Sequence, residues 1–164
     1  MLSNLRPTVV LLLLLTAVTG LGYPLAVSGI AAIAFPDQAT GSLIRDGETV
    51  IGSRLIGQDF QSDRYFWPRP SATADAPYNA GASSGTNLGP TSAKLRDLVA
   101  AAVKRQRDAG IVGAIPADAV TSSGSGLDPH ISPAYARLQV ARVAQARGLA
   151  RDQVDALVSL QTET

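Results

Sequence analysis

An apolar stretch near the start of the chain is long enough to cross a membrane. Residues 7 to 36 carry no charged side chain, and an α-helix needs about 20 apolar residues to span a hydrocarbon core. A cleaved signal peptide is the alternative, but its apolar region usually has only about 7–15 residues. Tyr23 and Pro24 also occupy the region where cleavage would be expected. The pattern therefore favours a retained transmembrane helix over residues 8–34.

The charges beside this stretch predict its orientation. Arg6 and the amino terminus precede it, and Asp37 follows it. Because positive charge tends to stay on the cytoplasmic side, we expect residues 1–7 in the cytoplasm. Residues 35–164 then form a domain on the other side, which is the periplasm in a bacterium with the span in its inner membrane.

Small residues recur at intervals of four within the predicted span. Thr16, Gly20 and Pro24 share one face of a helix, and small residues at this spacing let another helix approach closely in lipid. Pro24 has no amide hydrogen, so the Gly20 carbonyl loses its helical partner and the helix should bend there. The face is either a docking surface for partner helices or an ordinary feature of a lone anchor, and the sequence leaves both open.

Two β-prone runs follow the apolar stretch. Asp46-Gly47 separates them, and this dipeptide is typical of hairpins with a type I′ turn, which needs positive φ at both central positions. We expect strands near residues 42–45 and 48–56, with Gly52 at a bulge. The two strands would form a small antiparallel sheet.

Three later segments have helical patterns. Residues 91–109 form an amphipathic pattern, and Gly110 is placed to end that helix. A second helix is expected from Ser132-Pro133 to about Arg147, because serine followed by proline is typical of a helix start. Its terminator would be Gly148. The apolar positions of the first helix are Leu95, Leu98, Val99, Ala102 and Val103.

A last helix is expected near residues 151–161. Val154, Leu157, Val158 and Gln161 share one of its faces. Together, these elements predict one transmembrane helix followed by a mixed α/β domain of the α+β kind. That domain would contain a small antiparallel sheet and about three helices.

Residues 57–90 keep neither a helical nor a strand period, and they are rich in Gly, Pro, Ser and Asn. A structureless stretch of this length is usually functional or disordered. Five of the eight aromatic side chains lie between residues 60 and 78, which argues against disorder. We therefore expect an ordered, irregular loop that packs on its own domain or on a partner.

Charge and composition exclude several functions. Of 14 basic side chains, Arg6 alone precedes residue 37, so residues 37–164 carry 13 basic and 13 acidic side chains. Nucleic-acid binding is not expected from such a neutral domain. The lack of cysteine excludes disulfides and thiolate metal sites, and a single histidine, His130, excludes a histidine-rich metal site.

The chain also lacks the common devices for handling ATP. No Asp is followed by Lys, so the Asp-Lys-Thr-Gly phosphorylation motif is absent, and no Gly-Lys-Ser/Thr loop occurs. The segment SGSGLDPH contains Ser, Asp and His, but a hydrolase triad is defined by geometry and not by adjacency. We interpret Asp128-Pro129-His130 as a turn that leads to the helix cap at Ser132.

Four segments, read in order after the span, closely resemble the C subunit of the Kdp potassium-transporting ATPase. They are GSRLIGQDF, YFWPRPSA, YNAGASSGTNLGPT and SGSGLDPHISPAYARLQVARVAQARGL. The similarity covers nearly the whole chain, and the ordered set is specific although each piece alone is weak. Thr86 stands where Ser is expected, and Ala150 replaces a more typical Ser or Thr cap. The second departure predicts a frayed start to the last helix.

The resemblance implies an accessory, non-catalytic subunit of a high-affinity bacterial potassium uptake pump. Its partners would be a channel-like subunit that binds potassium, a P-type ATPase subunit and a very small stabilising subunit. The family is needed for assembly and activity, and it has been described as a catalytic chaperone that raises the affinity for ATP. No metal or cofactor would be bound directly, because ATP and potassium act through the complex. With the predicted topology, an effect on ATP would be allosteric.

Candidate partner-interface residues lie in the span and in the irregular loops. Arginine and aromatic residues are enriched at the energetic centres of interfaces, so we interpret Tyr65, Phe66 and Arg69 as partly interfacial. We interpret Asn79 and Asn87 as structural residues that satisfy backbone groups of their own loop. The full set is Thr16, Gly20, Pro24, Gln58, Tyr65, Phe66, Arg69, Tyr78, Asn79, Asn87, Asp128 and His130.

Two points stay open at this stage. Asp59, Asp63 and Asp75 carry charge that would attract cations to an entrance, but sequence does not define a potassium cage. The alternative to a pump subunit is a stand-alone, membrane-anchored periplasmic binding protein or hydrolase.

Overall fold

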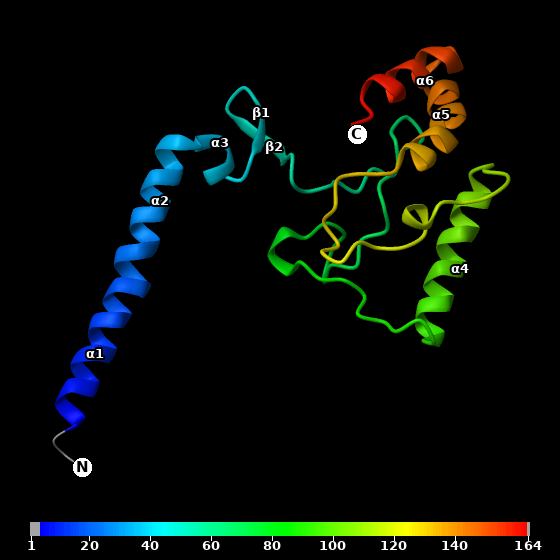
Figure 1. The fold of residues 1–164 in the computed structure, drawn as a ribbon. Coiled ribbons are helices and arrows are strands. Elements are labelled where there is room, and N and C mark those ends of the chain that lie inside the picture. Colours follow the sequence, from blue (N-terminus) through cyan, green and yellow to red (C-terminus); the bar gives the residue numbers. More distant parts are fainter. Residues whose placement is uncertain (1–3, 164) are drawn as a thin grey trace. The chain divides into compact units, whose positions relative to one another are not determined.

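The computed structural model of the protein describes residues 4–163 (Figure 1). Residues 1–3, which belong to the predicted cytoplasmic end, and Thr164 lie outside the described part. The chain divides into two compact units, Met1–Ser53 and Arg54–Thr164. The fold confirms the predicted class, with one long apolar helix, a small two-stranded antiparallel sheet and several further helices.

The first unit begins with a continuous helix over Leu5–Ala34, which is long and apolar enough to cross a membrane. It consists of α1 (Leu5–Ala17), a π-helical segment (Val18–Gly22) and α2 (Tyr23–Ala34). No side chain of α1 or α2 is buried, so the helix exposes an apolar surface along its whole length. Lipid would cover such a surface.

The regular hydrogen bonding of this helix is interrupted directly before Pro24. The amide of Tyr23 donates to the Val18 carbonyl, five residues earlier, which is the π-helical pattern. A proline has no amide hydrogen to donate, and π segments are one of the known causes of helix kinks. The irregularity lies where the sequence predicts it; the bend itself stays a prediction.

A short helix, α3 (Pro36–Ala39), leads into the hairpin of β1 (Leu43–Asp46) and β2 (Thr49–Ser53). Ile44 pairs with Gly52 and Arg45 pairs with Val50, so β2 has one extra residue, Ile51, at this point. The irregularity that the sequence predicts at Gly52 is therefore present directly beside it. β2 ends at Ser53 and is shorter than the predicted strand over residues 48–56.

The prediction of a type I′ turn at Asp46-Gly47 is wrong. Asp46 pairs with Thr49 across the hairpin, so the two central residues are Gly47 and Glu48. Only Gly47 has a positive φ, of 58°, whereas a type I′ turn needs positive φ at both positions. Glycine at the first central position is instead the requirement of the type II′ turn, the other common hairpin turn.

The second unit contains α4 (Ala93–Asp108), α5 (Pro133–Arg147), α6 (Arg151–Leu160) and two short 3₁₀ helices (Ala80–Ala82 and Ala117–Ala119). Serine side chains cap the first two α-helices: Ser92 Oγ accepts from the Leu95 amide, and Ser132 Oγ accepts from the Tyr135 amide. Gly148 ends α5 with a φ of 67°. The three predicted helices are therefore confirmed.

The start of α6 lacks a side-chain cap at Ala150, as the sequence indicates. Half of a capping box is nevertheless present, because Gln153 Oε1 accepts from the Ala150 amide at 3.1 Å. This bond satisfies one backbone donor at the helix start. Fraying of the helix stays a prediction.

The apolar core of the second unit lies where α5 packs on α6. Its buried members are Val140, Val143, Ala144 and Val154, with Phe66 and Val158 packed against them. The predicted face of α6 is only partly correct, because Leu157 is 55% exposed and Gln161 is exposed. On α4, Leu98 is also exposed, whereas Gln106 is buried.

Candidate functional site

Two irregular segments, residues 57–90 and 121–132, pack together and contain most of the candidate residues. Backbone hydrogen bonds join them: the Gly57 amide donates to the Leu127 carbonyl, and the Ser84 amide donates to the Ser125 carbonyl, both at 2.9 Å. The longer segment is therefore ordered and irregular, as predicted. Its order comes from contacts with the shorter segment and with α5.

Tyr78 lies buried at the centre of this packing, with a φ of 59°. Its hydroxyl donates to the Arg69 carbonyl at 2.8 Å, and its amide donates to Ser71 Oγ at 2.9 Å. Ser71 Oγ in turn donates to the Gly126 carbonyl at 2.7 Å. Tyr78 thus ties together three points of the two segments, and its ring belongs to the interior.

Two glycines allow this close approach. A Cβ at Gly57 would lie 2.4 Å from Cε1 of Tyr78, and a Cβ at Gly126 would lie 2.5 Å from the Ser84 carbonyl oxygen. Gly126 also has a φ of 68°, a conformation that favours glycine. Both positions therefore need a residue without a side chain.

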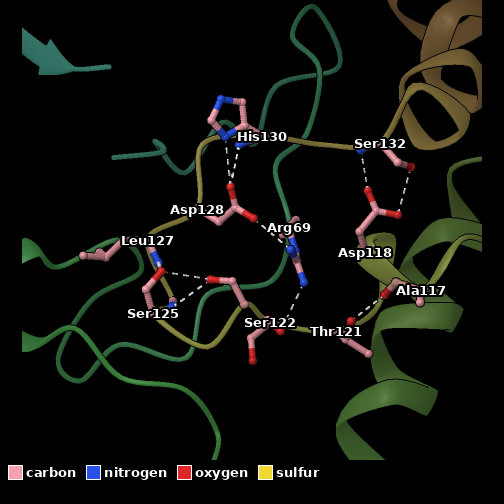
Figure 2. A network of polar contacts seen from close by, with 12 residues as sticks. Arg69, Ala117, Asp118, Thr121, Ser122, Ser125, Leu127, Asp128, His130 and Ser132 are labelled. Carbon is pink, nitrogen blue, oxygen red and sulfur yellow. Dashed lines mark hydrogen bonds and ion pairs between the residues drawn. The ribbon is translucent and has the colours of Figure 1, made fainter. Parts of the chain in front are cut away.

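Arg69 of the longer segment forms a polar network with Asp128 and His130 of the shorter segment (Figure 2). Arg69 Nη1 lies 2.8 Å from Asp128 Oδ2, and both side chains are mostly buried. Arg69 Nη2 donates to the Ser122 carbonyl. Asp128 Oδ1 accepts from the His130 amide at 3.0 Å and lies 3.3 Å from the His130 Nδ1 atom. The carboxylate of Asp128 thus closes the turn that the sequence predicts before α5.

Two pKa values in this region are shifted by the packing. Burial by itself raises the pKa of Asp128, but hydrogen bonds from His130 and Arg69 and the charge of Arg69 outweigh it and lower the pKa below 3.8. Burial, with the negative charges of Asp59 and Asp128, raises the pKa of Tyr78 to about 12. Asp128 is therefore ionised and Tyr78 neutral in the folded protein at neutral pH.

The arrangement does not assemble a hydrolase triad from the Ser, Asp and His of this region. Ser132 Oγ caps α5 and donates to Asp118 Oδ1 at 3.0 Å, as Figure 2 shows. Ser125 Oγ accepts from the Leu127 amide. Within residues 4–163, no serine hydroxyl forms a hydrogen bond with the His130 ring, whose side chain is largely exposed.

The second anchor of the loop is Trp67, which is held by Gln139 and Arg142 from α5 and by Arg105 from α4. The Trp67 amide donates to Gln139 Oε1 at 2.7 Å, and Gln139 Nε2 donates to the Trp67 carbonyl at 3.1 Å. The guanidinium of Arg142 lies 3.9 Å from the centre of the indole, and that of Arg105, from α4, lies 4.6 Å away. Such cation–π contacts are favourable when they exclude water.

Arg142 also donates to the carbonyls of Asp63 and Tyr65, at 2.8 and 3.1 Å. Its side chain is largely shielded from solvent. Burial lowers the pKa of Arg142 and outweighs the opposing charge of Asp63. The residue nevertheless stays charged at neutral pH, because an arginine titrates far above that range.

A buried hydrogen bond connects α4 to α5. Gln106 Nε2 donates to the hydroxyl of Tyr135 at 2.9 Å, and both residues are buried. Burial raises the pKa of Tyr135 against the opposing hydrogen bond from Gln106. This directional contact fixes one point at which α4 meets α5.

The structure separates the candidate interface residues into groups. Asn79 is structural, as predicted: its side chain accepts from the Gly81 amide and donates to the Ala74 carbonyl. Phe66 packs on the core of α5 and α6. Tyr65 is 45% exposed. Exposed positions further include Gln58, Asn87 and His130, and in the apolar helix Thr16, Gly20 and Pro24.

Several residues that organise the site were not among the sequence candidates. Gln139 and Arg142 lie on α5 between apolar positions. A polar residue in such a pattern would ordinarily be assigned to the solvent-exposed face of the helix. Phe60 and Arg147 were also missed. No local signal identifies Gln139, Arg142 and Arg147, because their loop partners lie more than 70 positions away in the chain. Phe60 stacks on Tyr65 within the loop itself, and an irregular sequence does not show which loop aromatics pair.

The described residues include no group of three or more His, Cys, Asp or Glu side chains that could hold a metal ion. Asp59 contacts the side chain of Gln61, and Asp63 lies 3.6 Å from Arg142. These carboxylates are therefore engaged by neighbouring side chains. A role for them in attracting potassium stays a prediction.

Comparisons with known proteins place these features in a family. The model of the family described as "K+-transporting ATPase, c chain" matches residues 5–164. A potassium-transporting ATPase KdpC subunit of Allorhizobium ampelinum is 55% identical over 163 residues, covering 99% of this chain and 85% of the relative. The KdpC subunit of Variovorax paradoxus is 55% identical over 161 residues, covering 97% and 83%. That of Sorangium cellulosum is 55% identical over 165 residues, covering 99% and 87%.

Proposed function

Because this chain belongs to the KdpC family of K⁺-transporting ATPase subunits, we propose that it is an accessory, non-catalytic subunit of an ATP-driven potassium uptake complex. The observation that carries the proposal is the family match over residues 5–164, which includes both the apolar helix and the second unit. Its partners are then ATPase-type subunits. We assign them as a potassium-binding channel-like subunit, a P-type ATPase subunit and a small stabilising subunit.

The geometry of the second unit supports a scaffold more than a catalyst. The polar groups of Arg69, Asp128 and Ser132 bind one another or nearby backbone. Tyr78 and Gln139 are likewise used to fix the loops internally. Groups that are already committed to such bonds hold a shape, and a stable shape is what an assembly subunit presents to its neighbours.

The apolar helix supports a membrane anchor with its short end in the cytoplasm. Arg6 lies in the first turn of the helix and Asp37 follows its end, which is the charge order of an N-in span. The second unit would then lie on the periplasmic side, across the membrane from cytoplasmic ATP. We therefore infer that any increase in the ATP affinity of the complex is allosteric and arises because assembly favours one pump conformation.

Co-purification tests the assembly role. The affinity-tagged full chain, co-expressed with the large pump subunits, is expected to retain them in detergent and to be required for potassium-stimulated ATPase activity. The chain purified alone is expected to show no ATP hydrolysis. Robust hydrolysis, or tight ligand binding by the chain alone, would instead favour a stand-alone periplasmic protein.

The absence of cysteine allows a direct test of topology. Asn4→Cys and Ala100→Cys place single thiols at exposed positions on either side of the apolar helix. In intact cells, a membrane-impermeant maleimide is expected to label the second variant from the periplasm, and the first only after the inner membrane is opened. The reverse pattern would overturn the orientation and the allosteric argument with it.

A further inference from the structure

Two aromatic side chains of the long loop remain exposed although the loop is ordered. Phe60 is 39% and Tyr65 is 45% exposed. Their rings stack with centroids 5.0 Å apart at an angle of 27°. The guanidinium of Arg147, from the end of α5, lies 5.2 Å from the centre of the Tyr65 ring. Phe60, Tyr65 and Arg147 are called the aromatic patch below.

The backbone beneath the aromatic patch is fixed by α5. Arg142 donates to the carbonyls on both sides of Arg64, those of Asp63 and Tyr65, and Arg147 Nε donates to the carbonyl of Arg64 itself. Three successive carbonyls of an exposed loop are thus held by two guanidinium groups. The patch is already ordered before any partner binds, which lowers the entropic cost of docking.

The charges around the patch point to an acidic partner. Arg64, Arg105, Arg142 and Arg147 carry four positive charges, and Asp59 and Asp63 carry two negative charges, which leaves a net charge of about +2. Within residues 4–163, Arg147 donates a hydrogen bond only from Nε, to the carbonyl of Arg64. Its terminal nitrogens are therefore available for a carboxylate, which arginine binds in a bidentate manner.

We propose that the aromatic patch docks a protein segment of another pump subunit, with a carboxylate facing Arg147 and an apolar side chain against Phe60 and Tyr65. This inference rests on the proposed function. Tyrosine and arginine are the residue types that dominate binding energy at protein interfaces. A protein segment is favoured over an anionic lipid surface, because Asp59 and Asp63 lie in the same loop and lipid-binding clusters are predominantly basic.

The test uses the full chain, tagged and co-expressed with the large subunits. Phe60→Ser combined with Tyr65→Ser is expected to lower retention of the partner subunits at least tenfold in detergent. Val112→Ser is the matched control, since Val112 is an apolar side chain that is 87% exposed outside the patch, and it is expected to retain them fully. Unchanged emission of Trp67 and an unchanged unfolding temperature show that the double variant is folded.

Arg147→Gln adds a readout that a merely structural role would not move. Removal of the charge is expected to weaken retention at low salt and to make retention less sensitive to added salt. Full retention by the folded double variant, or an unchanged salt response in Arg147→Gln, overturns the proposal. The proposal is also overturned if the double variant loses partner subunits only in anionic lipid nanodiscs and not in detergent, because that result assigns the patch to lipid binding. If the wild-type chain itself fails to retain the subunits, the proposed function fails instead.

Discussion

The side-chain amide of Gln139 and the backbone of Trp67 form a reciprocal pair of hydrogen bonds across 72 positions of the chain. The Trp67 amide donates to Gln139 Oε1 at 2.7 Å, and Gln139 Nε2 donates to the Trp67 carbonyl at 3.1 Å. Both residues are buried. The amide therefore replaces the backbone partner that a strand or helix would supply to this part of the loop.

Replacing Gln139 should destabilise the second unit strongly. Gln139→Leu leaves two buried backbone groups without partners, and we expect a loss of about 2–4 kcal/mol in the free energy of unfolding. Urea unfolding of the full chain in detergent can be followed by fluorescence, because Trp67 is the only tryptophan. Gln145→Leu, at an exposed position of the same helix, is the control and should change the midpoint little. Equal urea midpoints for Gln139→Leu and Gln145→Leu would contradict a stabilising role for the hydrogen bonds between Gln139 and Trp67.

Gly57→Ala should cost stability through steric overlap. The new Cβ would lie 2.4 Å from Cε1 of buried Tyr78, so the ring or the backbone must move, at a cost of about 1–3 kcal/mol. Gly89→Ala meets no atom within 4 Å and is the matched control. Thermal unfolding of the full chain measures both. A Gly57→Ala protein as stable as the control would show that the packing at Tyr78 adapts freely.

The ion pair of Asp128 with Arg69 predicts a dependence of stability on acid pH. The pKa of Asp128 is lowered in the folded protein, so its contribution is present above the ordinary value near 3.8 and is lost as pH falls through the lower folded value. Asp128→Asn should remove this part of the acid dependence and lower stability at neutral pH.

Asp108→Asn is the control for the loss of a carboxylate. Asp108 forms an exposed pair with Lys104, and such pairs contribute at most about 1 kcal/mol. The acid unfolding profile of Asp108→Asn should match that of the wild type. Identical profiles for Asp128→Asn and the wild type would contradict the assigned shift.

Tyr78 predicts a second dependence, at alkaline pH. Because its pKa is raised to about 12 in the folded protein, its contribution is complete below the ordinary pKa of about 10 and is lost as pH rises through the folded value. The free energy of unfolding of Tyr78→Phe should therefore depend less on pH between about 10 and 12 than that of the wild type. It should also lose about 1 kcal/mol at neutral pH, because the bond to the Arg69 carbonyl is absent. An unaltered alkaline profile would argue against the shift.

The small-residue face of the apolar helix gives a prediction for assembly. Gly20→Leu should reduce co-purification of the pump subunits if a partner helix packs closely there, because a bulky side chain separates the two backbones. Gly29→Leu, nine residues later and roughly on the far side of the helix, is the control. Equal yields for the two variants would leave the face with an anchoring role only.

Local signals were sufficient for most of the fold. Gly110, Ser132 and Gly148 mark helix ends because capping depends on adjacent residues. The hairpin was also predicted correctly, but the predicted type I′ turn was wrong. Asp46 pairs with Thr49, so the central residues of the turn are Gly47 and Glu48 and not Asp46 and Gly47. The Asp-Gly dipeptide alone does not fix this one-residue difference in pairing.

The organisation of the site could not be predicted in the same way. Asn79 acts within its own loop, so its structural role follows from residue type. Gln139 and Arg142 act on carbonyl and amide groups far away in the chain, and no periodicity encodes such partners. Tyr78 appeared in sequence as one of several loop aromatics, and its burial, its internal hydrogen bonds and the close approach of Gly57 show it to be interior.

The π-helical segment Val18–Gly22 has a consequence for how a neighbour would lie along the membrane helix. Eight residues of an ideal α-helix rotate by about 80° beyond two full turns, so Thr16 and Pro24 would drift sideways on a regular helix. A π turn contains more residues than an α turn, so each residue rotates less about the axis, which reduces the sideways drift. The three small residues are thereby brought closer to a straight line, which suits a neighbouring helix that runs alongside without coiling around it.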